Sequence, residues 1–203
     1  MCIKSSTDGE SEYITDGYDG ILYAAKAGYY RSNRGFAILN CSWGGYSYSV
    51  LENATIDVAH NDYNAIIVAA AGNGNGGEED AAHYPSSYEN VISVCAIGCN
   101  GQWGGWASYH PTVDLAAPGE SIYSAIIGSG YASWNGSSMA GPNAASCIGL
   151  LKAFYPDMDN DQLIERITST ADRFIYDRNP EYETCNGYAG NDCLGKGMVD
   201  AYK

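Results

Sequence analysis

The chain has 203 residues and a mass of 21.6 kDa, long enough for one domain with a buried core. Apolar residues make up 45% and charged residues 17%, the balance of a folded globular protein rather than a disordered one. The net charge of −14 argues against binding to nucleic acid or to an anionic membrane surface. The longest unbroken apolar run, Ala65–Ala71, is far shorter than the roughly 20 residues of a membrane span. We therefore expect no nucleic-acid partner and no membrane partner.

The first half of the chain alternates helical and strand patterns. An apolar stripe from Ile14 to Ala25 predicts a helix that ends at Gly28, and a weaker helical pattern covers Leu51–His60. Three short apolar runs predict buried strands: Phe36–Leu39, Ile66–Ala71 and Val91–Ile97. Strands that alternate with helices in this way predict an α/β fold with a mostly parallel sheet flanked by helices on both faces.

The last third of the chain is mainly helical. A helix is predicted over Met139–Tyr155, where Pro156 stops it. Asp159, with Gln162 three residues later, predicts a capped helix that runs to Ala171. From residue 173 to residue 203 the pattern is that of a Gly- and Asn-rich loop.

The seven cysteines cannot all pair with one another. We expect a small disulfide loop between Cys185 and Cys193. Cys41 and Cys147 stand in apolar surroundings, which favours buried and unreactive thiols. No group of cysteines and histidines has the spacing of a zinc site.

A first glycine-rich segment, residues 72–77, fits the dinucleotide-binding pattern G-x-G-x-x-G. The residues that follow argue against this interpretation. Glu78, Glu79 and Asp80 would place three carboxylates beside a pyrophosphate, and Pro85 interrupts any helix that could bind it.

A second segment, Asn135–Pro142, lies between a Gly/Ser loop and the predicted helix that begins at Met139. Ser138 could simply cap that helix, as serine often does. The small residues Ala140 and Gly141 would also let a substrate backbone approach closely. Because the N-terminus of a helix favours negative charge, the position suits a serine whose attack creates an oxyanion.

Five segments in register resemble those of the subtilisin-like serine peptidases, or subtilases. They are Leu39-Asn-Cys-Ser42-Trp43-Gly44-Gly45, Val68-Ala-Ala-Ala-Gly72-Asn73, Asp114-Leu-Ala-Ala-Pro118-Gly119, Gly136-Ser-Ser138-Met-Ala-Gly-Pro142 and Gly195-Lys-Gly-Met-Val199. The resemblance implies a serine endopeptidase of that fold, with a peptide or protein as substrate and mainly apolar selectivity. It makes Ser138 the nucleophile that forms an acyl-enzyme and Asn73 a donor to the oxyanion. Considered alone, Asn73 would read as a turn residue in a glycine loop.

The resemblance also implies a substrate-binding site. Ser42, Trp43 and Gly44 would pair with an extended peptide as an added strand. The other wall of the first specificity pocket would consist of three small residues: Ala70, Ala71 and Gly72.

Two residues of this site have a second interpretation. Trp43 either narrows the substrate subsites or is an ordinary buried aromatic residue. His83 either forms a titratable floor of the specificity pocket or is a hydrogen-bonded loop histidine, and the sequence leaves both interpretations open. Tyr84-Pro85, which follows, is a candidate for a cis peptide bond.

The acid and the histidine that such a serine requires are missing from their expected motifs. His60 reads as a surface residue of a helix and His110 as a loop residue. Residues 1–203 are therefore interpreted as the C-terminal two-thirds of a peptidase domain, inactive alone. The alternative is a non-catalytic protein that keeps the fold for peptide binding.

The resemblance requires no cofactor and predicts no catalytic metal. Asp114 is a candidate ligand of a structural calcium ion, although one carboxylate alone is a weak signal. We expect a monomer that is secreted to the extracellular space.

Overall fold

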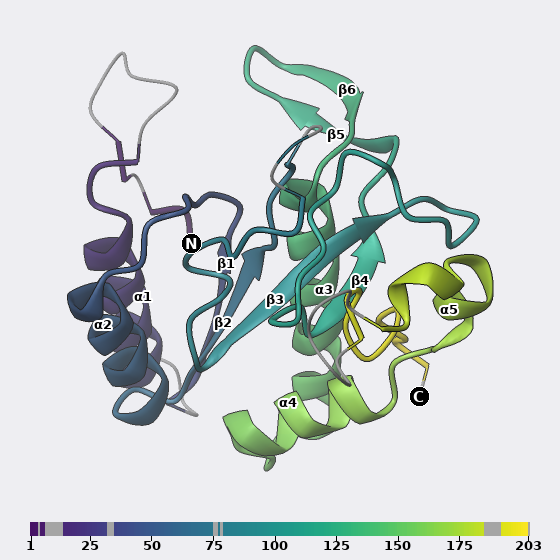
Figure 1. Cartoon of the computed structure of the whole chain (residues 1–203). Helices are drawn as coiled ribbons and strands as arrows, with labels where there is room; N and C mark the ends of the chain where they lie inside the picture. Colours follow the sequence, from purple (N-terminus) through teal and green to yellow (C-terminus); the bar gives the residue numbers. More distant parts are fainter. Residues whose placement is uncertain are drawn as a thin grey trace.

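The structure is a computed structural model that describes residues 1–3, 5–6, 14–31, 35–74, 77, 79–184 and 192–202. Its centre is a parallel sheet with the strand order β1-β2-β3-β4 (Figure 1). The strands are β1 (Ala37–Cys41), β2 (Ala65–Ala70), β3 (Val91–Ile97) and β4 (Leu115–Pro118). The expected α/β fold with a parallel sheet is confirmed.

Helices cover both faces of this sheet. The helices α1 (Gly17–Arg31) and α2 (Val50–Asn61) pack on one face, and α3 (Ser137–Phe154) and α4 (Asn160–Ser169) pack on the other. Figure 1 shows α1 and α2 side by side at one end of the sheet, with α3 behind the central strands. Within the described residues, no helix is long and apolar enough to cross a membrane.

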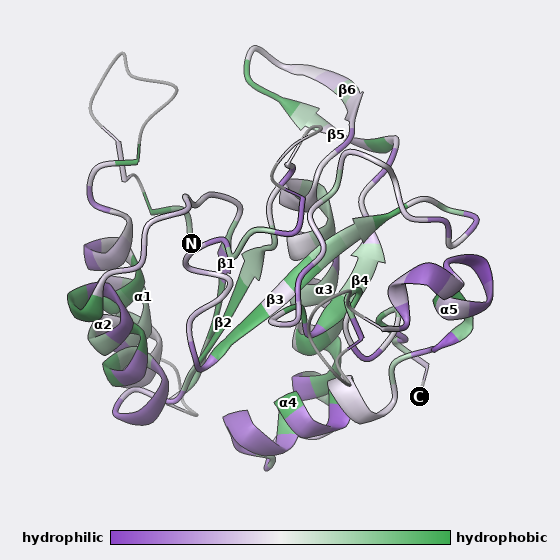
Figure 2. Cartoon of the chain, in the orientation of Figure 1, coloured by the Kyte–Doolittle hydropathy of each residue, from purple (hydrophilic) through white to green (hydrophobic). Residues whose placement is uncertain are grey.

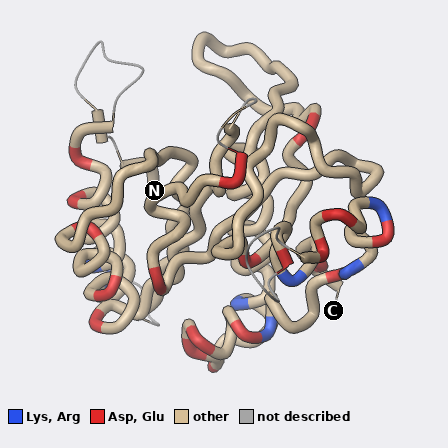
Figure 3. Tube along the Cα trace, viewed as in Figure 1, with Lys and Arg blue, Asp and Glu red and all other residues tan. Residues whose placement is uncertain are grey.

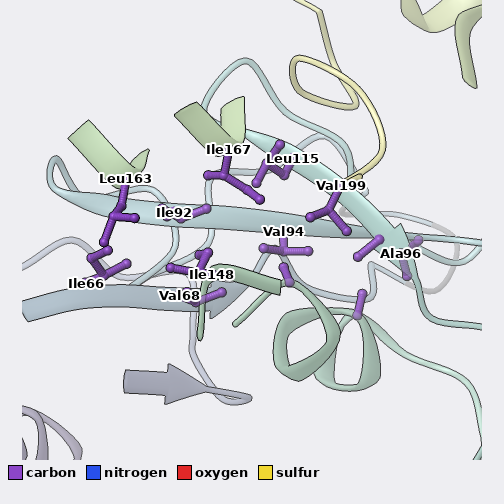
Figure 4. Packing of buried hydrophobic residues seen from close by; sticks show 14 residues of the cluster. Ile66, Val68, Ile92, Val94, Ala96, Leu115, Ile148, Leu163, Ile167 and Val199 are labelled. Atoms are coloured by element: carbon purple, nitrogen blue, oxygen red, sulfur yellow. The ribbon is translucent and has the colours of Figure 1, made fainter. Parts of the chain in front are cut away.

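A separate hydrophobic core lies on each face of the sheet, and strand β2 contributes side chains to both. All six of its residues are buried, and alternate side chains point to opposite faces. Ile66 and Val68 join the cluster under α3 and α4, whereas Ile67 and Ala69 join the cluster under α1 and α2. Figure 2 shows the hydrophobic central strands, and Figure 4 shows the side chains that meet Ile148 of α3 and Leu163 and Ile167 of α4.

The first helix extends beyond its predicted end. Gly28 lies inside α1, which continues to Arg31. A Cβ atom on Gly28 would lie 2.5 Å from the Cβ of Ala37, at the start of β1. The glycine is therefore a site of close helix–strand packing rather than a helix stop.

Several short elements were not predicted. They are β4, the antiparallel hairpin of β5 (Ile122–Ile126) and β6 (Gly130–Trp134), the five-residue helix α5 (Phe174–Arg178) and the 3₁₀ turn η1 (Pro180–Tyr182). The prediction of a loop throughout residues 173–203 is wrong where α5 and η1 form. Helix α4, by contrast, begins with the predicted capping box of Asp159 and Gln162.

The described cysteines include buried thiols, the exposed thiols of Cys2 and Cys99, and one disulfide-bonded residue. Cys41 and Cys95 are free and buried, and burial raises the pKa of both thiols to about 12. Cys147 is only partly buried, so the prediction of full burial is wrong for this residue. Cys193 is disulfide-bonded, and its expected partner, Cys185, lies outside the described residues.

Candidate active site

The loop after β4 fixes the start of α3. The N–H of Gly136 donates to the carbonyl of Gly119 over 2.8 Å. Gly119 tolerates no side chain, since a Cβ atom there would lie 2.5 Å from the Cβ of Ala96 in β3. The first turn of α3 is thereby held at the carboxyl end of the parallel strands, where α/β folds commonly place their ligands.

Ser138 lies in this first turn and forms hydrogen bonds with Ser42, the residue that directly follows β1. Its Oγ donates to the carbonyl of Ser42 over 3.3 Å, and the Oγ of Ser42 donates to the carbonyl of Ser138 over 2.8 Å. The amide of Asn40 donates to the Oγ of Ser42 over 2.9 Å. The structure thus brings the predicted nucleophile into direct contact with the predicted peptide-binding segment.

Asn73 is oriented by Ser137, which the sequence analysis had not singled out. The N–H and the hydroxyl of Ser137 donate to Asn73 Oδ1 over 2.9 and 3.1 Å. Because a backbone N–H can only donate, the accepting atom must be the oxygen of the Asn73 amide. The same Ser137 hydroxyl accepts from the N–H of Gly72 over 3.2 Å, so it links the loop after β2 to α3.

Two donors border one small space beside Gly136. The position that a Cβ atom would take on Gly136 lies 3.5 Å from Asn73 Nδ2 and 3.6 Å from the backbone nitrogen of Ser138. The glycine leaves this space open. Two donors near the positive end of a helix dipole are an arrangement that stabilises an anionic oxygen.

The segment from Ser42 to Gly45 forms one wall of the site. Gly45 forms an antiparallel bridge with Tyr84, with N–H···O distances of 2.8 and 2.7 Å. The Tyr84–Pro85 peptide bond is cis, as the sequence suggested. The side chain of Trp43 reaches the start of α1, where a Cβ on Gly17 would lie 2.6 Å from its ring. Trp43 is half-buried.

His83 lies between the two predicted walls. A Cβ atom on Gly44 would lie 2.3 Å from its Cε1, and one on Gly72 would lie 3.3 Å from its Cδ2. Ala70 and Ala71, on the Gly72 side, are buried. Burial lowers the pKa of His83, and a hydrogen bond to the backbone of Ala70 partly opposes this effect. Among the described residues its Nδ1 is buried without a hydrogen-bond partner.

The other histidines have structural partners. His60, predicted at the surface, is buried between α2 and α4, with its ring nitrogens 3.1 Å from the carbonyl of Ala65 and from Asp161 Oδ1. His110 bonds to the hydroxyl of Thr112 over 2.8 Å. In the part of the chain that the structure describes, no histidine hydrogen-bonds to Ser138.

Asp114, the candidate calcium ligand, is buried and hydrogen-bonded to the backbone of β3. Its Oδ2 accepts from the N–H of Ser93 over 2.8 Å, and burial raises its pKa to about 6 against the opposing effects of that bond and of Lys196. Calcium requires six to eight oxygen ligands. The described residues include no group of three or more His, Cys, Asp or Glu side chains that could hold a metal ion.

Comparison with known protein families matches residues 4–192 to the Subtilase family. The chain is 35% identical over 150 residues to Subtilisin DY of Bacillus licheniformis, a match that covers 71% of this chain and 54% of that protein. It is 34% identical over 170 residues to Subtilisin E of Bacillus subtilis (strain 168), covering 83% of this chain and 42% of that protein. The chain thus spans about half the length of these relatives.

Solved structures of proteases share the fold. A protease of Pseudoalteromonas arctica PAMC 21717 superposes with a TM-score of 0.74 at 27% identity, over 92% of this chain and 56% of that one. The S41 psychrophilic protease gives a TM-score of 0.75 at 25% identity, over 95% of this chain and 65% of that one.

Proposed function

This chain belongs to the subtilase family, and we propose that it supplies the nucleophile and the oxyanion-binding donors of a serine endopeptidase site. The observation that carries the proposal is the space beside Gly136, which both Asn73 Nδ2 and the Ser138 backbone nitrogen border. In this proposal the N–H of Ser138 is one of the two donors, and its Oγ attacks the carbonyl whose oxygen enters that space.

The chemistry proceeds in two stages. Ser138 Oγ attacks the scissile carbonyl, the oxyanion forms beside Asn73, and the amine leaves to give an acyl-enzyme. Water then hydrolyses the ester and restores the serine. In the first stage a base accepts the serine proton and gives it to the leaving amine. In the second stage the base accepts a proton from the attacking water and returns it to Ser138 Oγ. This base is commonly a histidine oriented by an acid.

The substrate is proposed to be a peptide or protein that binds in an extended conformation along Ser42–Gly44. Among the described residues, hydrogen bonds from backbone to backbone beyond β1 begin at Gly45, and the Ser42 carbonyl accepts from Ser138 Oγ. The backbone groups of Trp43 and Gly44 are therefore available for a peptide, and Ala70, Ala71, Gly72 and His83 would surround its first side chain. Main-chain bonds of this kind supply affinity, and the pockets supply selectivity.

In the described part of the chain, none of the three histidines forms a hydrogen bond with Ser138. We therefore propose that the base comes from outside residues 1–203. We expect these residues alone to be inactive.

The test is hydrolysis of a peptide p-nitroanilide by a protein that contains this chain together with the missing acid and base. Ser138→Ala should lower kcat by about 10⁶, whereas Ser146→Ala, on the exposed side of the same helix, should leave it unchanged. Retained hydrolysis by the Ser138→Ala variant would refute the assignment.

A second candidate is a non-catalytic peptide-binding protein. The observation in its favour is that Ser138 has the Ser42 carbonyl, and no histidine, as its described hydrogen-bond partner. Tight binding of an extended peptide without turnover, in the longest form of the protein that cells make, would support this candidate over the peptidase.

We also propose that the protein is secreted and monomeric. The disulfide at Cys193 and the charge of −14 support secretion, because disulfides persist mainly in oxidising compartments.

A further inference from the structure

A second pocket opens next to the peptide-binding segment. It has a volume of about 480 Å³, and Trp43, Gly44 and Gly45 form one of its sides. The remaining walls are largely aromatic, with Tyr18 from α1 and Tyr84 from the loop before β3. Tyr18 and Trp43 meet edge to face, with ring centroids 5.4 Å apart. A peptide on Ser42–Gly44 would therefore pass the mouth of this pocket.

One charged side chain lines this pocket, that of Glu52 in the first turn of α2. Its spacing from Ser49 is that of a capping box, in which the glutamate would accept from the N–H of Ser49. The structure shows a different arrangement. The N–H of Ser49 bonds to the hydroxyl of Tyr88 over 2.9 Å, and that hydroxyl donates to Glu52 Oε2 over 2.8 Å. The carboxylate is therefore held by a tyrosine and is not used as a cap.

The Glu52 carboxylate can accept further hydrogen bonds from a ligand. An ionised carboxylate has about four acceptor positions. The bond from Tyr88 takes one of them, and the hydroxyl of Tyr18 interacts with the same carboxylate. Within the described parts of the chain, no lysine or arginine forms an ion pair with Glu52. Figure 3 shows most of the visible basic residues near α4 and α5 rather than near α1 and α2. Among the described residues, this carboxylate therefore has no cationic side chain as its partner.

We propose that this pocket, here called the Glu52 pocket, binds a lysine or arginine side chain of a peptide that lies along Ser42–Gly44. A cationic head group would meet the carboxylate while its aliphatic stem packs against Tyr18, Trp43 and Tyr84. Aromatic rings attract cations through their faces, and partial removal from water strengthens this attraction. The inference rests on one part of the proposed function, the binding of an extended peptide along Ser42–Gly44. It differs from the apolar selectivity that the family resemblance implies.

The test measures binding rather than hydrolysis. The probes are acetylated and amidated hexa-alanine peptides with one lysine at each position in turn, each paired with a peptide that has norleucine at the same position. Norleucine keeps the stem and removes the charge. Calorimetry with a protein that contains this chain together with the missing acid and base, carrying Ser138→Ala to prevent hydrolysis, should show, at one position, about tenfold tighter binding of the lysine peptide. The preference should weaken at high salt.

Glu52→Gln keeps an acceptor for Tyr88 and removes the charge, so it should reduce the lysine preference to less than twofold and leave binding of the norleucine peptide unchanged. Glu165→Gln, an exposed position on α4, is the matched control and should keep the preference. The comparison of lysine with norleucine needs no substitution at Glu52, so it remains decisive if the Glu52 variant does not fold.

The outcomes separate the two proposals. Equal binding of lysine and norleucine peptides at every position would overturn the inference and leave the peptide-binding function standing. Failure of every peptide to bind would overturn both. A lysine preference that depends on Glu52, in a protein whose complete form does not hydrolyse peptides, would support the inference and refute the peptidase.

Discussion

Pro142 lies four residues after Ser138 in α3, so it withholds from the Ser138 carbonyl the N–H that a regular helix would supply. The hydroxyl of Ser42 donates to this carbonyl instead, over 2.8 Å. Because the Ser42 carbonyl in turn accepts from Ser138 Oγ, a proline in the helix fixes the candidate nucleophile against the peptide-binding segment.

Replacement of Ser42 by alanine should destabilise the protein. The variant leaves the Ser138 carbonyl without its donor in a partly buried position, and an unmet acceptor of this kind costs about 1–3 kcal/mol. We expect a loss of about 1–2 kcal/mol in the free energy of unfolding, measured by urea denaturation. Ser146→Ala, in the same helix but exposed, should change it by less than about 0.5 kcal/mol.

The role of the proline can be measured in a double-mutant cycle. Pro142→Ala restores an N–H that can reach the Ser138 carbonyl, so Ser42→Ala should cost less in that background than in the unsubstituted protein. Equal costs in the two backgrounds would show that Pro142 does not create the need for Ser42.

Replacement of Asn73 by aspartate should separate catalysis from stability. The aspartate keeps the acceptor for the N–H and hydroxyl of Ser137, but it loses the Nδ2 donor and places a negative charge beside the oxyanion. Loss of the corresponding donor in subtilisin lowers kcat by about 10²–10³, and we expect at least that loss in a complete active form. The free energy of unfolding should change by less than about 1 kcal/mol.

The control for Asn73→Asp is Asn135→Asp. Asn135 Oδ1 accepts from the N–H of Ser121 over 2.7 Å, and the same change adds the same charge near α3 without removing a donor from the space beside Gly136. If both variants lost activity equally, charge near the helix would explain the effect and the donor role of Asn73 would be wrong.

The sequence predicted those helices and strands whose apolar pattern continues over many residues. The burial of β2 follows from its unbroken apolar run and α1 from its periodic apolar stripe, and β3 has the predicted bounds of Val91–Ile97. Strand β4 was missed because its four residues carry no period, and the exposed β5–β6 hairpin lacks an apolar face. The sequence pattern predicts a helix end at Gly28, because the close contact with Ala37 that explains this glycine exists only in the folded structure.

The candidate site was predictable only in part for the same reason. Ser138 and Asn73 stand in recognisable segments, and the structure brings them to one place. The roles of Ser137, which orients Asn73, and of Glu52 depend on contacts between residues far apart in the chain. Ser137 directly precedes the predicted nucleophile, so its position was the one available signal. Glu52 had none, because its spacing from Ser49 is typical of a helix cap.

Replacement of His60 by alanine should destabilise the protein although the residue stands far from the site. Its ring bridges the carbonyl of Ala65 and Asp161, and the amide of Asn160 donates to its carbonyl over 3.1 Å. Removal of the ring leaves a cavity and an unmet acceptor, so we expect a loss of about 2 kcal/mol in the free energy of unfolding. Asp161→Ala should cost less than about 1 kcal/mol, since this carboxylate is 80% exposed. Similar costs for the two variants would show that the buried His60 ring stabilises the protein no more than the exposed Asp161 carboxylate does.

Replacement of Asp114 by asparagine should remove part of the dependence of stability on pH. Burial raises the pKa of Asp114 in the folded state to about 6, above its ordinary value of 3.8. Its contribution to stability is therefore fully present below pH 3.8 and is lost as the pH rises through about 6. The free energy of unfolding of Asp114→Asn, minus that of the unsubstituted protein, should be larger at pH 8 than at pH 4 by about 2 kcal/mol. Urea denaturation at several pH values measures this difference. A difference for Asp114→Asn that stays constant with pH would show that the carboxyl group of Asp114 ionises alike in the folded and unfolded chain.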